Sequence, residues 1–101
     1  MPRVSLRRDQ VLDLLRQHKP EFEQRYGVTA LGVFGSVARD EATSASDVDV
    51  VVQLREPDLY YLVHIKDALE AAVGCHVDIV HYRERMNPFL KRRIDRERVY
   101  V

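Results

Sequence analysis

The chain has 101 residues, 46% of them hydrophobic and 32% charged, which is typical of a globular protein and predicts one domain over residues 1–101. A single cysteine, Cys75, excludes a disulfide within the chain and favours a reducing cytoplasm, where we expect the protein to reside. No apolar run approaches the roughly 18 residues that cross a bilayer, so we expect no membrane partner.

The formal net charge is zero, but the charges are unevenly distributed along the chain. Residues 1–39 carry 7 Lys and Arg against 4 Asp and Glu, residues 40–80 carry 2 against 9, and residues 81–101 carry 7 against 3. Nucleic-acid-binding proteins usually have a dominant basic balance, so no direct nucleic-acid partner is expected. The acidic middle third suits a metal site, and the basic ends suit phosphates or an acidic protein partner.

The first half of the chain predicts helix followed by strand. Ser5 can cap a helix that runs to about residue 19 along an apolar stripe at helical spacing. Pro20 can open a second, short helical turn, which Gly27 ends. Residues 28–34 are rich in strand formers, and the polar residues 40–46 predict a connecting loop.

The second half alternates strands and helices. We expect strands over residues 47–54 and 76–81, helices over residues 59–73 and 89–96, and a short edge strand over residues 99–101. The loop before the second strand is too short for a crossover helix, so the first two strands should pair antiparallel. The helix before the third strand makes the next pair parallel. The sequence thus predicts an α/β (α+β) fold, a small mixed sheet covered by helices.

The inward face of the last helix should carry Phe89, Leu90 and Ile94. These three apolar residues recur at helical spacing, and Pro88 opens the segment as a first helical residue. We therefore expect all three side chains to be buried against the sheet.

Three aspartates fall on strand-like segments. Asp47 and Asp49 lie two residues apart, so their side chains should point to the same face of one strand, and Asp78 lies in the next strand. Aspartate is poorly suited to strands, and close carboxylates repel unless a cation or a proton joins them. The three residues are therefore candidate catalytic residues and candidate ligands for Mg²⁺ or Mn²⁺.

A Gly-Ser turn follows the first strand. Gly35 lets the backbone approach a phosphate closely, and Ser36 can offer it a hydroxyl and an amide. Arg39 can clamp phosphates, or it can pair with Asp40 or Glu41. Gly35, Ser36 and Arg39 are thus candidate nucleotide-binding residues. His76 and His81 flank the third strand, where an ordinary structural role is favoured over a place in the cleft.

Taken together, Gly35, Ser36, Asp47, Asp49 and Asp78 resemble the motif of the minimal nucleotidyltransferase family, within the DNA-polymerase-β-like nucleotidyltransferase superfamily. Residues 34–39 and 91–97 also look similar to that family, and the likeness covers nearly the whole chain. The resemblance implies the nucleotidyltransferase fold, with Gly35 and Ser36 on the triphosphate of ATP and the three aspartates on the metals. Asp78 would also help to activate the acceptor hydroxyl.

One position departs from the family pattern. Asp40 stands where relatives usually have glycine, but aspartate tolerates the turn conformations that glycine adopts, so the fold should be kept. The extra negative charge near the phosphates could weaken nucleotide binding.

The resemblance further implies an antitoxin that transfers AMP from ATP to a tyrosine of a HEPN-domain toxin, in a hetero-oligomer. The short chain, with little beyond the catalytic sheet, independently favours a protein partner that supplies the acceptor. Two alternatives stay open at this point. One is a non-catalytic module that masks the toxin by contact, and the other is a transferase acting on a small hydroxylated molecule such as an aminoglycoside.

Overall fold

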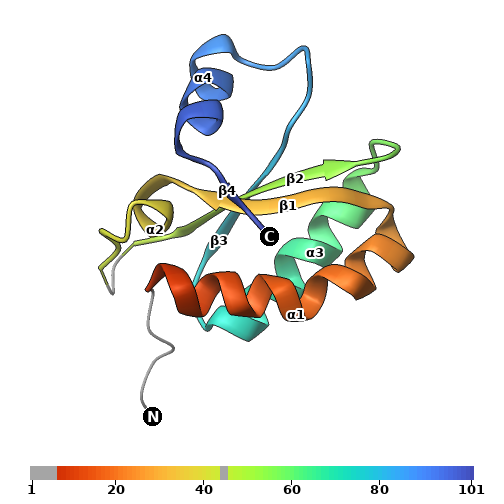
Figure 1. Ribbon diagram of the computed structural model, residues 1–101. Coiled ribbons are helices and arrows are strands. Elements are labelled where there is room, and N and C mark those ends of the chain that lie inside the picture. Colours follow the sequence, from red (N-terminus) through yellow and green to blue (C-terminus); the bar gives the residue numbers. More distant parts are fainter. Residues whose placement is uncertain (1–6, 44–45) are drawn as a thin grey trace.

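The computed structural model describes residues 7–43 and 46–101, which form helices on both sides of one sheet (Figure 1). The elements in chain order are α1 (Arg8–Tyr26), β1 (Val28–Phe34), α2 (Gly35–Ala38), β2 (Val48–Leu54), α3 (Leu59–Val73), β3 (Val77–His81), α4 (Pro88–Glu97) and β4 (Val99–Tyr100). Within these described residues, no helix is both long and apolar enough to span a membrane.

The sheet has four strands in the order β3-β2-β1-β4. β1 pairs antiparallel with β2 and with the short β4, while β2 and β3 run parallel, so the predicted mixed sheet is confirmed. The parallel pair is joined through α3, as a crossover requires. β1 therefore ends where β2 and β3 begin, and this edge of the sheet collects the Gly-Ser turn and the aspartates.

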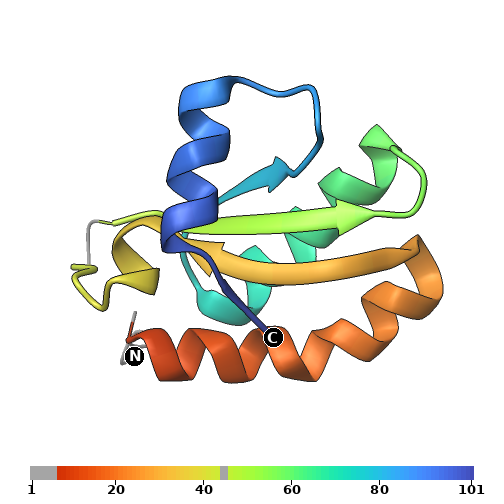
Figure 2. The same ribbon diagram turned by 45° about the horizontal axis from the view of Figure 1, so that its top comes forward.

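Helices α1 and α3 cover one face of the sheet, and α4 lies on the other (Figures 1 and 2). Val50 and Val52 of β2 join the larger buried cluster with α1 and α3, whereas Val51 joins Phe34 and Ile94 in a smaller cluster beneath α4. Because side chains alternate along a strand, Asp49 shares the face of Val51. The candidate site therefore opens on the α4 side of the sheet.

Three local predictions need correction. Pro20 does not begin a separate turn, because α1 runs through it to Tyr26, with Phe22 buried in the core beyond it. Gly35 and Ser36 do not form a simple turn but begin the four-residue helix α2. Phe89 does not face inward: it is 76% exposed, and Ile94 is the fully buried residue of α4. The predicted cap, Ser5, lies outside the described residues.

Candidate active site

Asp49 and Asp78 are direct neighbours across the parallel pair β2 and β3. Asp47 lies just before β2, and its carboxylate is within 4.8 Å of ligand atoms of both Asp78 and His76. The structure thus brings the three predicted aspartates to one edge of the sheet, but in two parts. Asp47, Asp78 and His76 form an exposed cluster, while Asp49 faces Gly35 and Arg93.

His76 also belongs to this cluster, although the sequence favoured an ordinary structural role for it over a place in the cleft. Its Nε2 lies 3.1 Å from Asp78 Oδ1, and its Nδ1 lies 2.9 Å from Glu70 Oε2 on α3. Glu70 Oε2 also accepts a hydrogen bond from the backbone N–H of Val77, and this bond is the main cause that holds the pKa of Glu70 below its usual value. Glu70 therefore contacts His76, and His76 contacts Asp78, so that the two residues hold the Asp78 carboxylate in position. The two-residue spacing of His76 and Asp78 was the available signal.

Asp49 is the aspartate of this group whose charged form is disfavoured by its surroundings. Burial raises its pKa, the charges of Asp78 and Asp47 raise it further, and Arg93 and Arg39 oppose them. Arg93 Nη2 lies 3.8 Å from Asp49 Oδ2, and the side chain of Asp49 is 22% exposed. A partly desolvated carboxylate beside two others favours a bound cation or a proton.

The donor set at this edge fits a divalent metal. Carboxylate oxygens are the protein ligands that Mg²⁺ and Mn²⁺ prefer, and Asp47, Asp49 and Asp78 supply them from adjacent backbone positions. His76 occupies one oxygen of Asp78, which leaves the other carboxylate oxygens for a metal.

Gly35 sits at the sharp junction between β1 and α2, with a φ of 72° that side chains rarely adopt. Its N–H donates to Glu97 Oε1 at 3.1 Å. An added Cβ at position 35 would collide with Asp49 Oδ2, so this glycine lets the backbone lie against the carboxylate. The half-buried Ser36 follows in the first turn of α2.

Arg39 and Asp40 end α2. Arg39 pairs with Glu41 at 3.2 Å, one of the two roles expected for it, and also with Glu97 at 3.0 Å, which sequence reasoning missed. Asp40 has a φ of 57°, which confirms that it adopts the left-handed conformation usual for glycine. Its carboxylate accepts the N–H of Arg8 at the start of α1.

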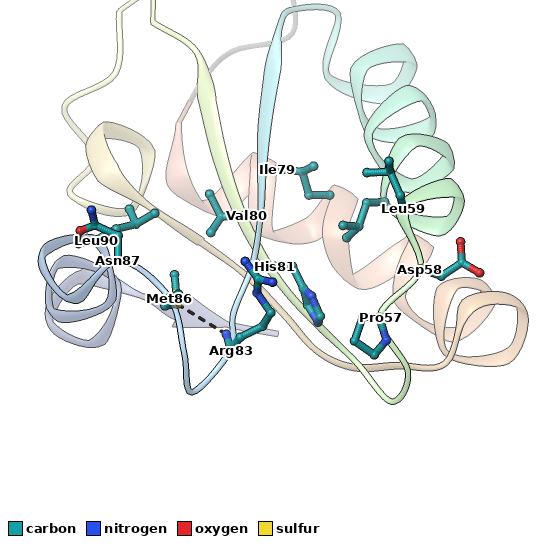
Figure 3. Close-up of a pocket in the computed structure, with 11 residues that line it drawn as sticks. Pro57, Asp58, Leu59, Ile79, Val80, His81, Arg83, Met86, Asn87 and Leu90 are labelled. Carbon is teal, nitrogen blue, oxygen red and sulfur yellow. Dashed lines mark hydrogen bonds between the residues drawn. The ribbon is translucent and has the colours of Figure 1, made fainter.

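The structure also contains a groove that none of the three aspartates lines (Figure 3). It lies between the start of α3, the end of β3 and the segment leading into α4, and its volume is about 580 Å³. Its apolar lining comes mainly from Leu59, Leu62, Ile79, Val80, Met86 and Leu90. None of the six predicted site residues, all of them in the described part of the chain, lines this groove.

The chain is similar to several known proteins. Residues 15–101 match the family described as "Nucleotidyltransferase domain". The chain is 37% identical over 94 residues to "Protein adenylyltransferase MntA" of Thermococcus cleftensis, covering 92% of this chain and 94% of that protein. It is also similar to a solved structure whose name describes a minimal nucleotidyltransferase, with 38% identity, a TM-score of 0.66, and 91% and 86% of the two chains covered.

A more distant likeness concerns the fold alone. The solved "Crystal structure of the toxin-antitoxin with AMP-PNP" contains a chain with a TM-score of 0.68 at 19% sequence identity. The likeness covers 92% of this chain and 70% of that one.

Proposed function

We propose that this chain transfers AMP from ATP to a tyrosine hydroxyl of a partner protein. The chain belongs to the nucleotidyltransferase-domain family. The observation that carries this proposal is the register of Asp49 with Asp78 on parallel strands, beside the glycine that begins α2. Carboxylates from two strands and a close backbone approach are what phosphoryl chemistry requires.

Each predicted residue takes a defined role in this proposal. Gly35 and Ser36 hold the triphosphate at the start of α2, and Arg39 neutralises part of its charge. Asp47, Asp49 and Asp78 hold Mg²⁺ or Mn²⁺, which when bound neutralises phosphate charge and polarises the reacting oxygens. Asp78, whose exposed carboxylate contacts His76, helps to take the proton of the acceptor hydroxyl.

The reaction is a displacement at the α-phosphorus. The acceptor oxygen forms a bond to this phosphorus, the bond to the bridging oxygen breaks, and pyrophosphate leaves with its electron pair. The proton of the hydroxyl passes to Asp78 or to water. Positioning of the acceptor within about 3–3.5 Å of the phosphorus dominates such a step.

The acceptor side is proposed to come from a HEPN-domain toxin, which this protein would neutralise as an antitoxin in a cytoplasmic hetero-oligomer. Two likenesses support a protein acceptor. The Thermococcus relative is named a protein adenylyltransferase, and a fold neighbour is named as a toxin–antitoxin structure with AMP-PNP. The residue roles are therefore proposed for a protein substrate rather than for a small alcohol.

The direct test incubates the chain with ATP labelled at the α-phosphate, Mg²⁺ and a candidate HEPN-domain protein, and follows the label by gel and mass spectrometry. We expect label on a partner tyrosine, and none when EDTA is present. Label on a small hydroxylated compound without any partner would contradict the protein-acceptor proposal. Neutralisation of the toxin without transfer would contradict the catalytic proposal.

A further inference from the structure

Glu97, the last residue of α4, is the most enclosed carboxylate in any ion pair among the described residues, with 13% of its side chain exposed. One of its oxygens, Oε1, receives donors from three directions. The N–H of Gly35 lies 3.1 Å away, Nη1 of Arg39 lies 3.0 Å away, and Nε of Arg93 lies 3.4 Å away. A single carboxylate oxygen therefore joins α4 to both ends of α2.

Arg93 is held on three sides. Its Nε contacts Glu97, its Nη2 lies 3.8 Å from Asp49 Oδ2, and its guanidinium carbon lies 5.5 Å from the centre of the Phe34 ring. Arg93 belongs to the basic residues 81–101, which were expected to suit phosphates or an acidic protein partner. The structure directs Arg93 to the candidate site, one helical turn from Glu97 on the same face of α4.

The surroundings indicate why this contact matters. Glu97 holds two guanidinium groups beside the glycine that begins α2, and each also pairs with a second carboxylate, Arg39 with Glu41 and Arg93 with Asp49. Guanidinium groups suit phosphate oxygens because their N–H groups form a planar fork. Such a fork is effective only when it is already oriented, since an arginine side chain loses considerable freedom on ordering.

We propose that Glu97 is a positioning residue, whose carboxylate fixes the backbone at Gly35 and orients the guanidinium groups of Arg39 and Arg93 for a nucleoside triphosphate. This inference rests on the proposed function for its ligand and adds Arg93 to the phosphate-binding groups. Glu97 itself touches no substrate and acts only through the three groups that it holds.

The first experiment needs no nucleotide. Amide and arginine side-chain ¹H–¹⁵N spectra are compared for the full chain and for Glu97→Gln. Gln retains the size of the side chain but loses the charge that holds two arginines. We expect the Gly35 N–H and Arg93 Nε–H signals to shift in Glu97→Gln. They should not shift in Glu84→Gln, a matched change at an exposed residue that pairs with Lys91 at 3.5 Å. Unshifted signals would overturn the proposal whatever the protein's activity.

The second experiment measures AMP-PNP affinity with Mg²⁺ by calorimetry. We expect Glu97→Gln to weaken binding by about tenfold, the loss typical of charge-assisted hydrogen bonds. Because Glu97 acts on the phosphates through Arg39 and Arg93, Glu97→Gln should weaken binding far less in a background that carries Arg39→Gln and Arg93→Gln than in the wild type. Additive losses, or tighter binding in Glu97→Gln, would overturn the proposal. Tighter binding would mean that Glu97 competes with the phosphates.

A third variant separates position from charge. Glu97→Asp keeps the charge but is one methylene shorter, so it cannot reach all three donors. We expect Glu97→Asp to resemble Glu97→Gln in both experiments, and restoration of wild-type affinity would contradict positioning. If wild-type protein fails to bind AMP-PNP, the proposed function fails, while the spectra still decide whether Glu97 orders Gly35 and Arg93.

Discussion

Gly35 lies with its Cα against the carboxylate of Asp49, so closely that a methyl group at position 35 would collide with Asp49 Oδ2. Gly74 offers a matched comparison, because its φ of 74° nearly equals the 72° of Gly35 but its Cβ would meet no atom within 4 Å. Alanine substitutions at Gly35 and Gly74 can therefore separate the energetic cost of backbone strain from the cost of the collision with Asp49.

We therefore predict that Gly74→Ala costs about 1–2 kcal/mol of unfolding free energy, from left-handed strain alone. Gly35→Ala should cost a further 1–3 kcal/mol or so, because Asp49 must be displaced as well. Urea unfolding of both variants measures the difference. Equal losses would show that the contact between Gly35 and Asp49 is unimportant.

Asp49 should lower the stability of the folded protein until a cation binds. Its pKa is raised, chiefly by burial, so the folded state disfavours its charged form at neutral pH. We predict that Asp49→Asn raises the Tm by a few degrees without metal, equivalent to about 1 kcal/mol at this chain length. Mg²⁺ should then raise the Tm of the wild type but not of Asp49→Asn. The control is Asp67→Asn, at an exposed position on α3.

The raised pKa of Asp49 also predicts that Mg²⁺ affinity depends on pH. A carboxyl group with a raised pKa holds its proton more tightly when folded, so Mg²⁺ must displace that proton as the pH falls through the folded pKa. Mg²⁺ affinity should therefore weaken toward acid in the wild type. Calorimetric titrations at two pH values would reveal this, and affinity independent of pH would contradict a role for Asp49 in holding the metal.

Asp78 should matter more for turnover than for nucleotide binding. Asp78 lies on β3, whereas Gly35 follows the end of β1, and the His76 ring contacts the Asp78 carboxylate. We predict that Asp78→Asn lowers kcat by roughly 10²-fold or more while AMP-PNP affinity changes little, as expected for loss of an acid–base group. Single-turnover transfer to the partner protein measures kcat. Wild-type turnover in Asp78→Asn would remove this residue from the mechanism.

Much of the fold followed from local sequence signals. The bounds of β1 and α3 agree with the predicted residues 28–34 and 59–73. In β1 the run of strand formers ends at Gly35, and in α3 the apolar stripe ends at Gly74. The parallel pairing of β2 with β3, which puts Asp49 and Asp78 on neighbouring strands, followed from the crossover, whereas their direct register was not predicted.

The contacts of Glu97 could not be predicted in the same way. Glu97 reaches Gly35 from 62 residues away, and nothing in the helical pattern of α4 says which face meets the turn after β1. Phe89 was misplaced for a related reason: α4 packs on the smaller buried cluster through Ile94 and Leu90, and Phe89 lies on the exposed side of the helix. Tertiary placement decided both outcomes.

His81 should make the fold sensitive to mild acid. Its Nε2 accepts the N–H of Leu54, which requires a neutral ring, and burial lowers its pKa below the ordinary value of 6.5. The unfolded chain therefore binds a proton at His81 before the folded protein does, so stability falls as the pH drops below about 6.5. We predict that His81→Gln, whose amide oxygen can accept the same N–H, reduces this loss between pH 7.5 and 5.5, whereas His18→Gln on α1 does not. Urea unfolding at both pH values measures it, and equal pH dependence in all three proteins would contradict the assignment.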